Sequence, residues 1–233
     1  FNCHQLIEAY YGVPIARGIL LPLNVRLSVE EQCYILKDSG SKIVLFDPEF
    51  TNLCQSLHEE HPNLIWISFS EAEGLPEWVH PYSYEQLISK ACPQKVDFTT
   101  YDETIAAELF YTSGSTGVPK GVILSHRTLY LHALYGLLGA RRRAIDIAAD
   151  EVCEMHTIPL FHANGWGTPY AAPMCGAKIV FPGPHLDGES LVELIQDEEV
   201  TLSAAVPTVW LGILQYLKGT GKELGVLERV VIG

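Results

Sequence analysis

The feature that most constrains the fold of this chain is its repeated alternation of short apolar runs with helical segments. The runs K-I-V-L-F at 42–46 and L-I-W-I-S-F at 64–69 have the length and residue types of buried strands, and a helical pattern over 50–60 separates them. Strands that are apolar throughout occur in parallel sheets whose connecting helices cover both faces. The sequence therefore predicts an α/β fold with layered parallel-sheet lobes covered by helices.

The same alternation continues toward the C-terminal end of the chain. We expect strands at 152–158, 178–181, 202–206 and 227–232, and helices at 125–140, 165–175, 187–199 and 207–217.

Two local signals mark helix starts in the first part of the chain. Ser28 with Glu31 has the spacing of a capping box for a helix that stops near Gly40, and Asn2 is the candidate cap of a first helix. From 70 to 104 the pattern weakens into Pro, Glu and Tyr around one short helix at 84–91. We place a boundary between two lobes in that stretch.

An unusual loop separates the apolar run 107–111 from the helix that Ser125 opens. Glycines let backbone N–H groups turn inward, hydroxyls donate to phosphate oxygens, and an ammonium neutralises charge, so such a loop suits a polyphosphate. The residues that combine these properties are Thr112, Ser113, Gly114, Ser115, Thr116, Gly117 and Lys120.

This loop does not match two better-known phosphate motifs. The Walker pattern fails because Lys120 lies between Pro119 and Gly121, and the glycine spacing does not fit G-x-G-x-x-G. A bare cluster of Gly, Ser and Thr is more often an ordinary surface turn. The complete order of residues, with P-K-G at its end, favours a phosphate site.

A second cluster of functional residue types, P-L-F-H-A-N-G-W-G at 159–167, directly follows an apolar strand. Ligands of open α/β sheets bind at the carboxyl ends of strands. A histidine beside a phenylalanine is by itself more often a packed or capping residue than a ligand. Together with the phosphate loop, the cluster indicates a second part of one binding site.

The stretch Y-T-S-G-S-T-G-V-P-K-G at 111–121 resembles the phosphate-binding signature of adenylate-forming enzymes. That resemblance implies attack of a carboxylate on the α-phosphate of ATP, loss of pyrophosphate, and capture of the acyl-adenylate by a thiol, usually that of coenzyme A. It implies ATP and Mg²⁺ as cofactors, coenzyme A as co-substrate, and Thr112 as the Mg²⁺ ligand in this chain. It also places a catalytic lysine in a small C-terminal domain, so we expect no catalytic residue within this chain.

The segment 159–167 is similar to the second signature of fatty-acyl-CoA synthetases, which lies between the nucleotide site and the acyl tunnel. The resemblance implies that His162, Asn164 and Trp166 control entry of the acid. Amino-acid-activating members carry an aspartate where this chain has His162, and an ammonium buried without a counter-charge is costly. We therefore expect an acid without an α-amino group, and the resemblance implies an aliphatic acid of medium or long chain.

Three alternatives stay open at this point. A ligase for aromatic or short branched acids would share both motifs. A non-catalytic ATP- or acyl-binding relative would keep both loops but lack the catalytic lysine and the acidic metal ligand that the resemblance implies further along the full-length protein. A plain α/β structural module would leave two loop motifs unexplained.

Composition excludes some partners. The net charge is −13, which argues against nucleic acid or an anionic membrane surface as the main partner. No apolar run reaches the roughly 20 residues of a membrane span. The six cysteines show no zinc spacing, so we expect reduced thiols in a cytoplasmic protein.

The boundaries of the chain suggest a larger protein. The chain begins without an initiator methionine and closes in an apolar run, so we expect an internal fragment of a larger domain that has little ligase activity alone. The expected partners are a small carboxylic acid, ATP and coenzyme A, with a homodimer as one open oligomeric state.

Overall fold

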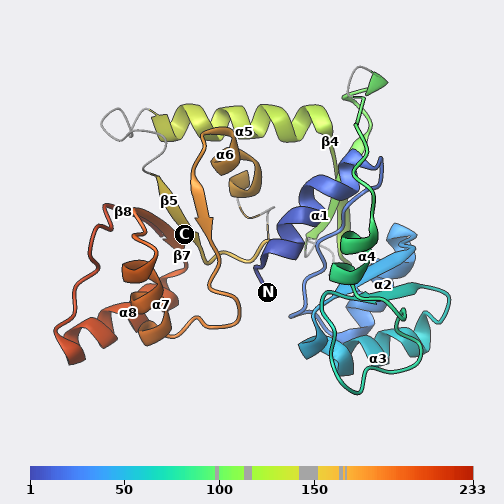
Figure 1. The fold of residues 1–233 in the computed structure, drawn as a ribbon, viewed down its shortest axis with the longest axis horizontal. Coiled ribbons are helices and arrows are strands. Elements are labelled where there is room, and N and C mark those ends of the chain that lie inside the picture. The colour runs from blue at the N-terminus through green and yellow to red at the C-terminus, as the bar shows by residue number, and fades with distance from the viewer. Residues whose placement is uncertain (98–99, 113–116, 142–151, 163–164, 166, 233) are drawn as a thin grey trace. The chain divides into compact units, whose positions relative to one another are not determined.

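A computed structural model describes residues 1–97, 100–112, 117–141, 152–162, 165 and 167–232 (Figure 1). The chain divides into two compact units that interleave along the sequence. The first unit comprises Phe1–Pro22, Glu103–Glu108 and Ile123–Gly233, and the second comprises Leu23–Asp102 and Leu109–Val122. The boundary between lobes that we expect at 70–104 stays a prediction.

The first unit contains a four-stranded parallel sheet, which confirms the predicted sheet type. Its strands lie in the order β6 (Lys178–Val180), β5 (Cys153–His156), β7 (Leu202–Ala205) and β8 (Arg229–Ile232). All neighbours run parallel, with Glu154 opposite Leu202 and Ser203 opposite Val230 in the ladders. The carboxyl end of β5, where the second motif begins, therefore lies in the middle of a parallel sheet.

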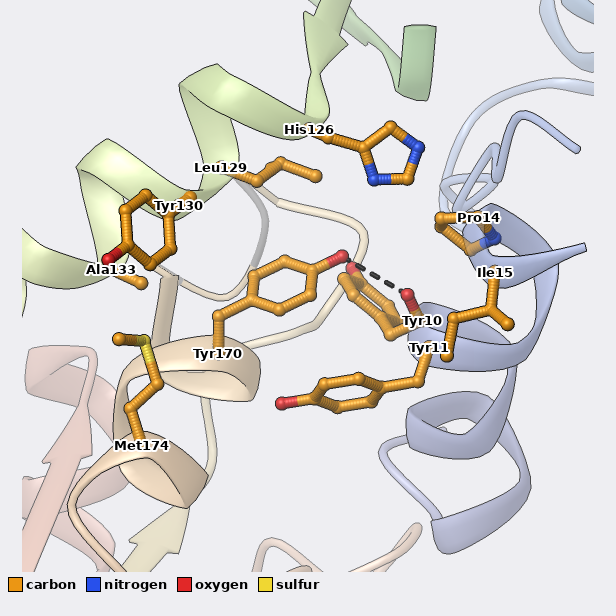
Figure 2. A pocket seen from close by; sticks show the side chains of 10 residues that line it. All are labelled: Tyr10, Tyr11, Pro14, Ile15, His126, Leu129, Tyr130, Ala133, Tyr170 and Met174. Atoms are coloured by element: carbon orange, nitrogen blue, oxygen red, sulfur yellow. Dashed lines mark hydrogen bonds between the residues drawn. The ribbon is translucent and has the colours of Figure 1, made fainter. Parts of the chain in front are cut away.

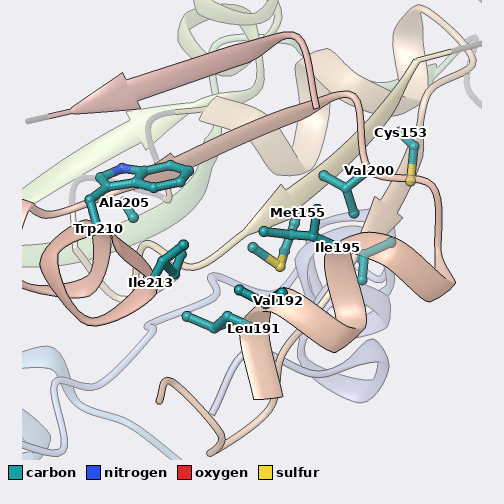
Figure 3. Close-up of a cluster of buried hydrophobic side chains, with 10 residues drawn as sticks. Cys153, Met155, Leu191, Val192, Ile195, Val200, Ala205, Trp210 and Ile213 are labelled. Carbon is teal, nitrogen blue, oxygen red and sulfur yellow. The ribbon is translucent and has the colours of Figure 1, made fainter. Parts of the chain in front are cut away.

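Two helices bury their apolar faces against this sheet. They are α7 (Gly188–Asp197) and α8 (Pro207–Thr220), and Figure 3 shows their side chains meeting those of β5. Leu191, Val192 and Ile195 of α7 and Met155 of β5 are fully buried. Leu191 and Ile195 are one helical turn apart, so α7 presents a continuous apolar stripe to the sheet. Asp187 caps the helix by accepting a hydrogen bond from the Ser190 N–H.

Three further helices of the first unit surround the loop after β5. They are α1 (His4–Ile15), α5 (His126–Arg141) and α6 (Thr168–Met174). The predicted cap of α5 is confirmed, because Ser125 Oγ accepts the Thr128 N–H at 3.2 Å. The predicted cap of α1 is wrong. Cys3 occupies the N-cap position without a side-chain hydrogen bond, and the Asn2 side chain bonds to residues more than 150 positions away.

The second unit contains a smaller parallel pair of strands, β1 (Ile43–Phe46) and β2 (Ile65–Ser68). Its core surrounds Trp66, which is fully buried. The helical elements of this unit are α2 (Val29–Ser39), η1 (Pro48–Phe50), α3 (Thr51–Glu60) and α4 (Tyr84–Lys90). The predicted capping box of α2 is confirmed, since Ser28 and Glu31 each bond the backbone of the other.

A third sheet is formed by β3 (Ala106–Thr112) and β4 (Lys120–Ser125), the strands that flank the phosphate loop. The first residues of β3 and the last residues of β4 belong to the first unit, and the remainder of each strand belongs to the second. In the first unit, Leu20 donates its N–H to the carbonyl oxygen of Ala107. Within the described parts of the chain, no helix is both long and apolar enough to cross a membrane.

The buried stripe of α7 supports a stability prediction. Leu191→Ala, measured by urea unfolding of the full-length protein, should lower the free energy of unfolding by about 2–5 kcal/mol, because Leu191 is fully buried. Leu214→Ala on α8 is the matched control, since Leu214 is 48% exposed, and its effect should be below about 1.5 kcal/mol. Equal losses in both variants would contradict the packing described here.

Candidate functional site

The two ends of the phosphate loop lie in the second unit and expose polar side chains. Thr112 ends β3 and Lys120 begins β4, and both are exposed. Gly117 has a φ of 83°, a conformation that favours glycine. Among the described residues, Lys120 makes no ion pair, so its ammonium is available to an anionic ligand. The predicted residues Ser113, Gly114, Ser115 and Thr116 lie outside the described part of the chain.

The first and last residues of the motif at 111–121, Tyr111 and Gly121, both have a structural role. The Tyr111 hydroxyl donates to Asp38 Oδ2 of α2 at 2.6 Å, and burial together with this carboxylate raises the pKa of Tyr111. A Cβ atom on Gly121 would lie 3.2 Å from the Tyr111 ring and 3.1 Å from Leu109, so β4 approaches β3 closely at this point. The strand that leads into the loop is thereby fixed to a helix of its own unit.

The second motif occupies the loop after β5 in the first unit, and we call residues 159–167 the gate loop. His162 N–H donates to the Pro159 carbonyl at 2.9 Å, and Gly165 N–H donates to the His162 carbonyl at 3.0 Å. The His162 side chain is exposed. Asn164 and Trp166, the other two predicted gate residues, lie outside the described part of the chain.

Helix α1 and Asn2, which precedes it, hold the backbone around the start of the gate loop. Asn2 Nδ2 donates to the carbonyl oxygens of His156 at 3.1 Å and Ile158 at 2.7 Å, and Asn2 Oδ1 accepts the Leu160 N–H at 3.0 Å. The Tyr10 hydroxyl donates to the carbonyl oxygen of Leu160 at 2.7 Å. These bonds satisfy buried backbone groups that a loop in this position would otherwise leave unpaired.

The end of the gate loop is similarly constrained. The Tyr11 hydroxyl donates to the carbonyl oxygen of Pro169 at 2.7 Å. Gly165 and Gly167 have φ values of 54° and 77°. A Cβ on Gly165 would lie 2.8 Å from Nε2 of His156, and one on Gly167 would lie 2.5 Å from the His132 ring. Glycine is required at both positions by conformation and by space.

His156 is a buried histidine beneath the gate loop that the sequence did not single out. It is fully buried, and neither ring nitrogen has a hydrogen-bond partner among the described residues. Its Nδ1 lies 3.8 Å from Glu154 Oε1, which accepts the Thr168 hydroxyl at 3.1 Å. The ring of His156 therefore packs beneath the loop next to Gly165. Because it is fully buried, it is not exposed to a ligand in solution.

A cavity of about 220 Å³ lies among α1, α5 and α6, all in the first unit (Figure 2). Its walls are mainly apolar and aromatic. In Figure 2 the Tyr170 ring projects from α6 toward α1, and its hydroxyl donates to the carbonyl oxygen of Tyr10 at 3.2 Å. The lining residues are Tyr10, Tyr11, Pro14, Ile15, His126, Leu129, Tyr130, Ala133, Tyr170 and Met174.

The residues at the phosphate loop suit an anion better than an all-protein metal centre. In the ranges that the structure describes, no group of three or more His, Cys, Asp or Glu side chains could hold a metal ion. Thr112 offers one hydroxyl, which fits a Mg²⁺ ion that takes its remaining ligands from phosphates and water. The metal-binding role of Thr112 stays a prediction.

Comparison with known proteins is consistent with this arrangement. The family model of AMP-binding enzymes matches residues 1–233. The chain is 40% identical to a long-chain-fatty-acid–CoA ligase of Thermus thermophilus over 100% of the chain and 41% of that protein. It is 36% identical to a medium-chain-fatty-acid–CoA ligase of Ectopseudomonas oleovorans over 100% of the chain and 42% of that protein. The chain thus spans about two fifths of the length of these curated relatives.

A solved structure supports the fold. The N-terminal domain of FACL13 from Mycobacterium tuberculosis, solved with an inhibitor bound, superposes with a TM-score of 0.78 at 24% identity, over 100% of this chain and 54% of that one. This likeness shows the fold.

The anchoring role of Asn2 generates a prediction. Asn2→Ala in the full-length protein should lower the free energy of unfolding by at least about 2 kcal/mol, because it leaves buried backbone groups unpaired. Asn63→Ala is the matched control, since Asn63 is exposed, and should change stability by less than about 0.5 kcal/mol. If Asn2→Ala and Asn63→Ala have the same free energy of unfolding, measured by heat or urea, Asn2 does not anchor the loop.

Proposed function

Because the chain belongs to the family of AMP-binding enzymes, we propose that the full-length protein is an ATP-dependent acyl-CoA ligase for a medium or long aliphatic carboxylic acid. The observation that carries this proposal is the phosphate loop. Its exposed Thr112 ends β3 and its exposed Lys120 begins β4. The hydrogen bond of Tyr111 and the close packing at Gly121 fix these two strand ends. The names of the relatives, long-chain and medium-chain fatty-acid–CoA ligases, support the choice of acid.

In the proposed first step, a carboxylate oxygen attacks the α-phosphorus of ATP. A bond forms between that oxygen and phosphorus, the bond to the bridging oxygen breaks, and pyrophosphate leaves with the electron pair. A thiolate of coenzyme A then displaces AMP from the acyl carbon. No general base is needed for the first step, because a carboxylic acid is already ionised near neutral pH.

The contribution of the phosphate loop would be positioning and charge neutralisation. The hydroxyls of Ser113, Ser115 and Thr116 and the backbone around Gly114 and Gly117 would cradle the β- and γ-phosphates. The Lys120 ammonium would lie near the leaving pyrophosphate. Mg²⁺, when bound, would neutralise phosphate charge, and Thr112 would supply its ligand from this chain.

The gate loop would admit the acid. His162 is exposed at the carboxyl end of β5, where ligands of parallel sheets bind. His162, Asn164 and Trp166 would control entry of the carboxylate and its acyl chain. The absence of an acidic side chain at position 162 disfavours substrates with an α-amino group, because their ammonium would lack a counter-charge there.

A panel of acids tests the proposed function. The full-length protein should consume ATP and coenzyme A with octanoate or longer acids and release AMP and pyrophosphate. A preference for benzoate-like or short branched acids would overturn the aliphatic assignment and favour the aromatic alternative. Binding of ATP or acid without turnover of any acid would favour the non-catalytic relative.

Two substitutions separate the proposed roles of the loops. Lys120→Ala should lower the rate of adenylation by about 10²-fold, because a charge that stabilises the leaving pyrophosphate is lost. Lys95→Ala, another exposed lysine, is its control and should leave that rate unchanged. Trp166→Ala should change KM or selectivity among acids more than KM for ATP.

Two results would contradict these roles. Adenylation by Lys120→Ala at the unaltered rate would remove Lys120 from the site. A Trp166→Ala variant that loses stability and keeps its order of preference among acids would make Trp166 a structural residue.

A further inference from the structure

Glu108 is a fully buried carboxyl group in β3 that the phosphate loop does not use. Its strand neighbour Ala107 is also fully buried, and the sequence pattern places Glu108 in an apolar run. Burial of a carboxyl group is costly unless hydrogen bonds compensate for the lost water. An apolar side chain of similar size would often be as stable or more stable at such a position. The presence of glutamate therefore calls for a specific role.

Tyr170 of α6 supplies a hydrogen-bond partner from a distant part of the sequence. Its hydroxyl bonds to Glu108 Oε1, and both residues belong to the first unit. The Tyr170 ring packs against those of Tyr10, with centroids 5.9 Å apart, and Tyr11, with centroids 5.5 Å apart. Burial and the Glu108 carboxyl group both raise the pKa of Tyr170, so the phenol keeps its proton at neutral pH.

The same hydroxyl also meets helix α1. It donates to the carbonyl oxygen of Tyr10 at 3.2 Å (Figure 2). In a regular helix this carbonyl would accept the N–H of residue 14, but residue 14 is proline and has no N–H. Pro14 thus leaves the Tyr10 carbonyl available to Tyr170. The hydroxyl of Tyr170 is fixed between β3 and α1.

Tyr170 lies in the first turn of α6, directly after the gate loop. The start of this helix carries the other contacts that fix the loop: the Thr168 bond to Glu154 and the Tyr11 bond to the Pro169 carbonyl. A hydrogen bond is directional, so the bond that the Tyr170 hydroxyl donates to Glu108 Oε1 fixes the rotation of α6 about its axis more narrowly than apolar packing would.

We propose that Glu108 is a positioning residue for the start of α6 and for Gly165 and Gly167, which lead into it, acting through its buried hydrogen bond with Tyr170. Glu108 does not touch the substrate in this role. It sets the orientation of the helix that follows the loop and thereby the geometry through which the acid enters. The part of this inference that concerns acid entry rests on the proposed ligase function, and the part that concerns the loop does not.

The test uses three variants of the full-length protein. Glu108→Leu removes the polar group, Tyr170→Phe removes the hydroxyl alone, and Glu108→Gln keeps a group that can donate to or accept from the Tyr170 hydroxyl. Tyr216→Phe is the matched control, because it deletes another tyrosine hydroxyl bonded to a glutamate, Glu189, at 3.2 Å. Hydrogen exchange of peptides covering 159–174 and steady-state kinetics with acid and ATP are measured for each.

We expect faster exchange across 159–174 in Glu108→Leu and Tyr170→Phe, and exchange as in the unmodified protein in Glu108→Gln and Tyr216→Phe. The acid KM should rise about tenfold in the first two variants, while the ATP KM changes by less than about twofold. The loss in the double variant Glu108→Leu/Tyr170→Phe should be smaller than the sum of the losses in the two single variants, because both single variants remove the same Glu108–Tyr170 hydrogen bond.

The outcomes separate this inference from the proposed function. Unchanged exchange in Glu108→Leu and Tyr170→Phe overturns the positioning role, whatever the kinetics. Equal rises in acid and ATP KM overturn it as well, since they indicate a general loss of structure. Faster exchange at 159–174 in a protein that activates no acid would keep the positioning role and refute the ligase function.

Discussion

The hydrogen bonds of Asn2 to three backbone groups between His156 and Leu160 tie the N-terminal segment of the first unit to the loop that follows β5. Strand β5 lies between β6 and β7, and among the described residues the ladders with both neighbours end by His156, so the segment up to Leu160 lies outside them. One amide side chain provides two donors and an acceptor at that point. The loop that follows can then expose His162 while its base stays fixed.

The helices and strands were largely predictable because their signals are local. The capping box at Ser28, the cap at Ser125 and the apolar runs of β1, β5 and β7 depend on residues a few positions apart, and each is confirmed. The division of the described strands into three separate sheets was not predictable, because strand pairing depends on contacts between distant segments. The capping role assigned to Asn2 failed for the same reason: a distant loop offers its side chain more bonds than the nearby helix does.

In the candidate site, too, local features could be predicted from the sequence and features that depend on distant contacts could not. Exposure of Thr112 and Lys120 at the ends of a glycine-rich loop could be expected from residue types alone. The residues that support the gate loop could not be predicted from the sequence. Aromatic residues and histidine are also common in an ordinary core, and the hydrogen-bond partners of these residues lie far along the chain. The residues concerned are Tyr10, Tyr11, His156 and Tyr170. Glycine at 165 and 167 is explained by the rings of His156 and His132, which leave no space for a Cβ atom at these positions. In a chain with a net charge of −13, the proposed attraction of a polyphosphate would have to come from such a local arrangement, because the long-range field opposes it.

Strand β8 closes the order of the four-stranded sheet, and within the described residues no strand pairs with its outer side. Val230, Val231 and Ile232 are all more than 40% exposed there. An apolar edge strand that has no neighbouring strand on one side is a template onto which another extended chain can add. Preparations of this chain by itself would therefore tend to self-associate through β8, in proportion to concentration, and a charged substitution such as Val230→Lys would make it easier to keep in solution.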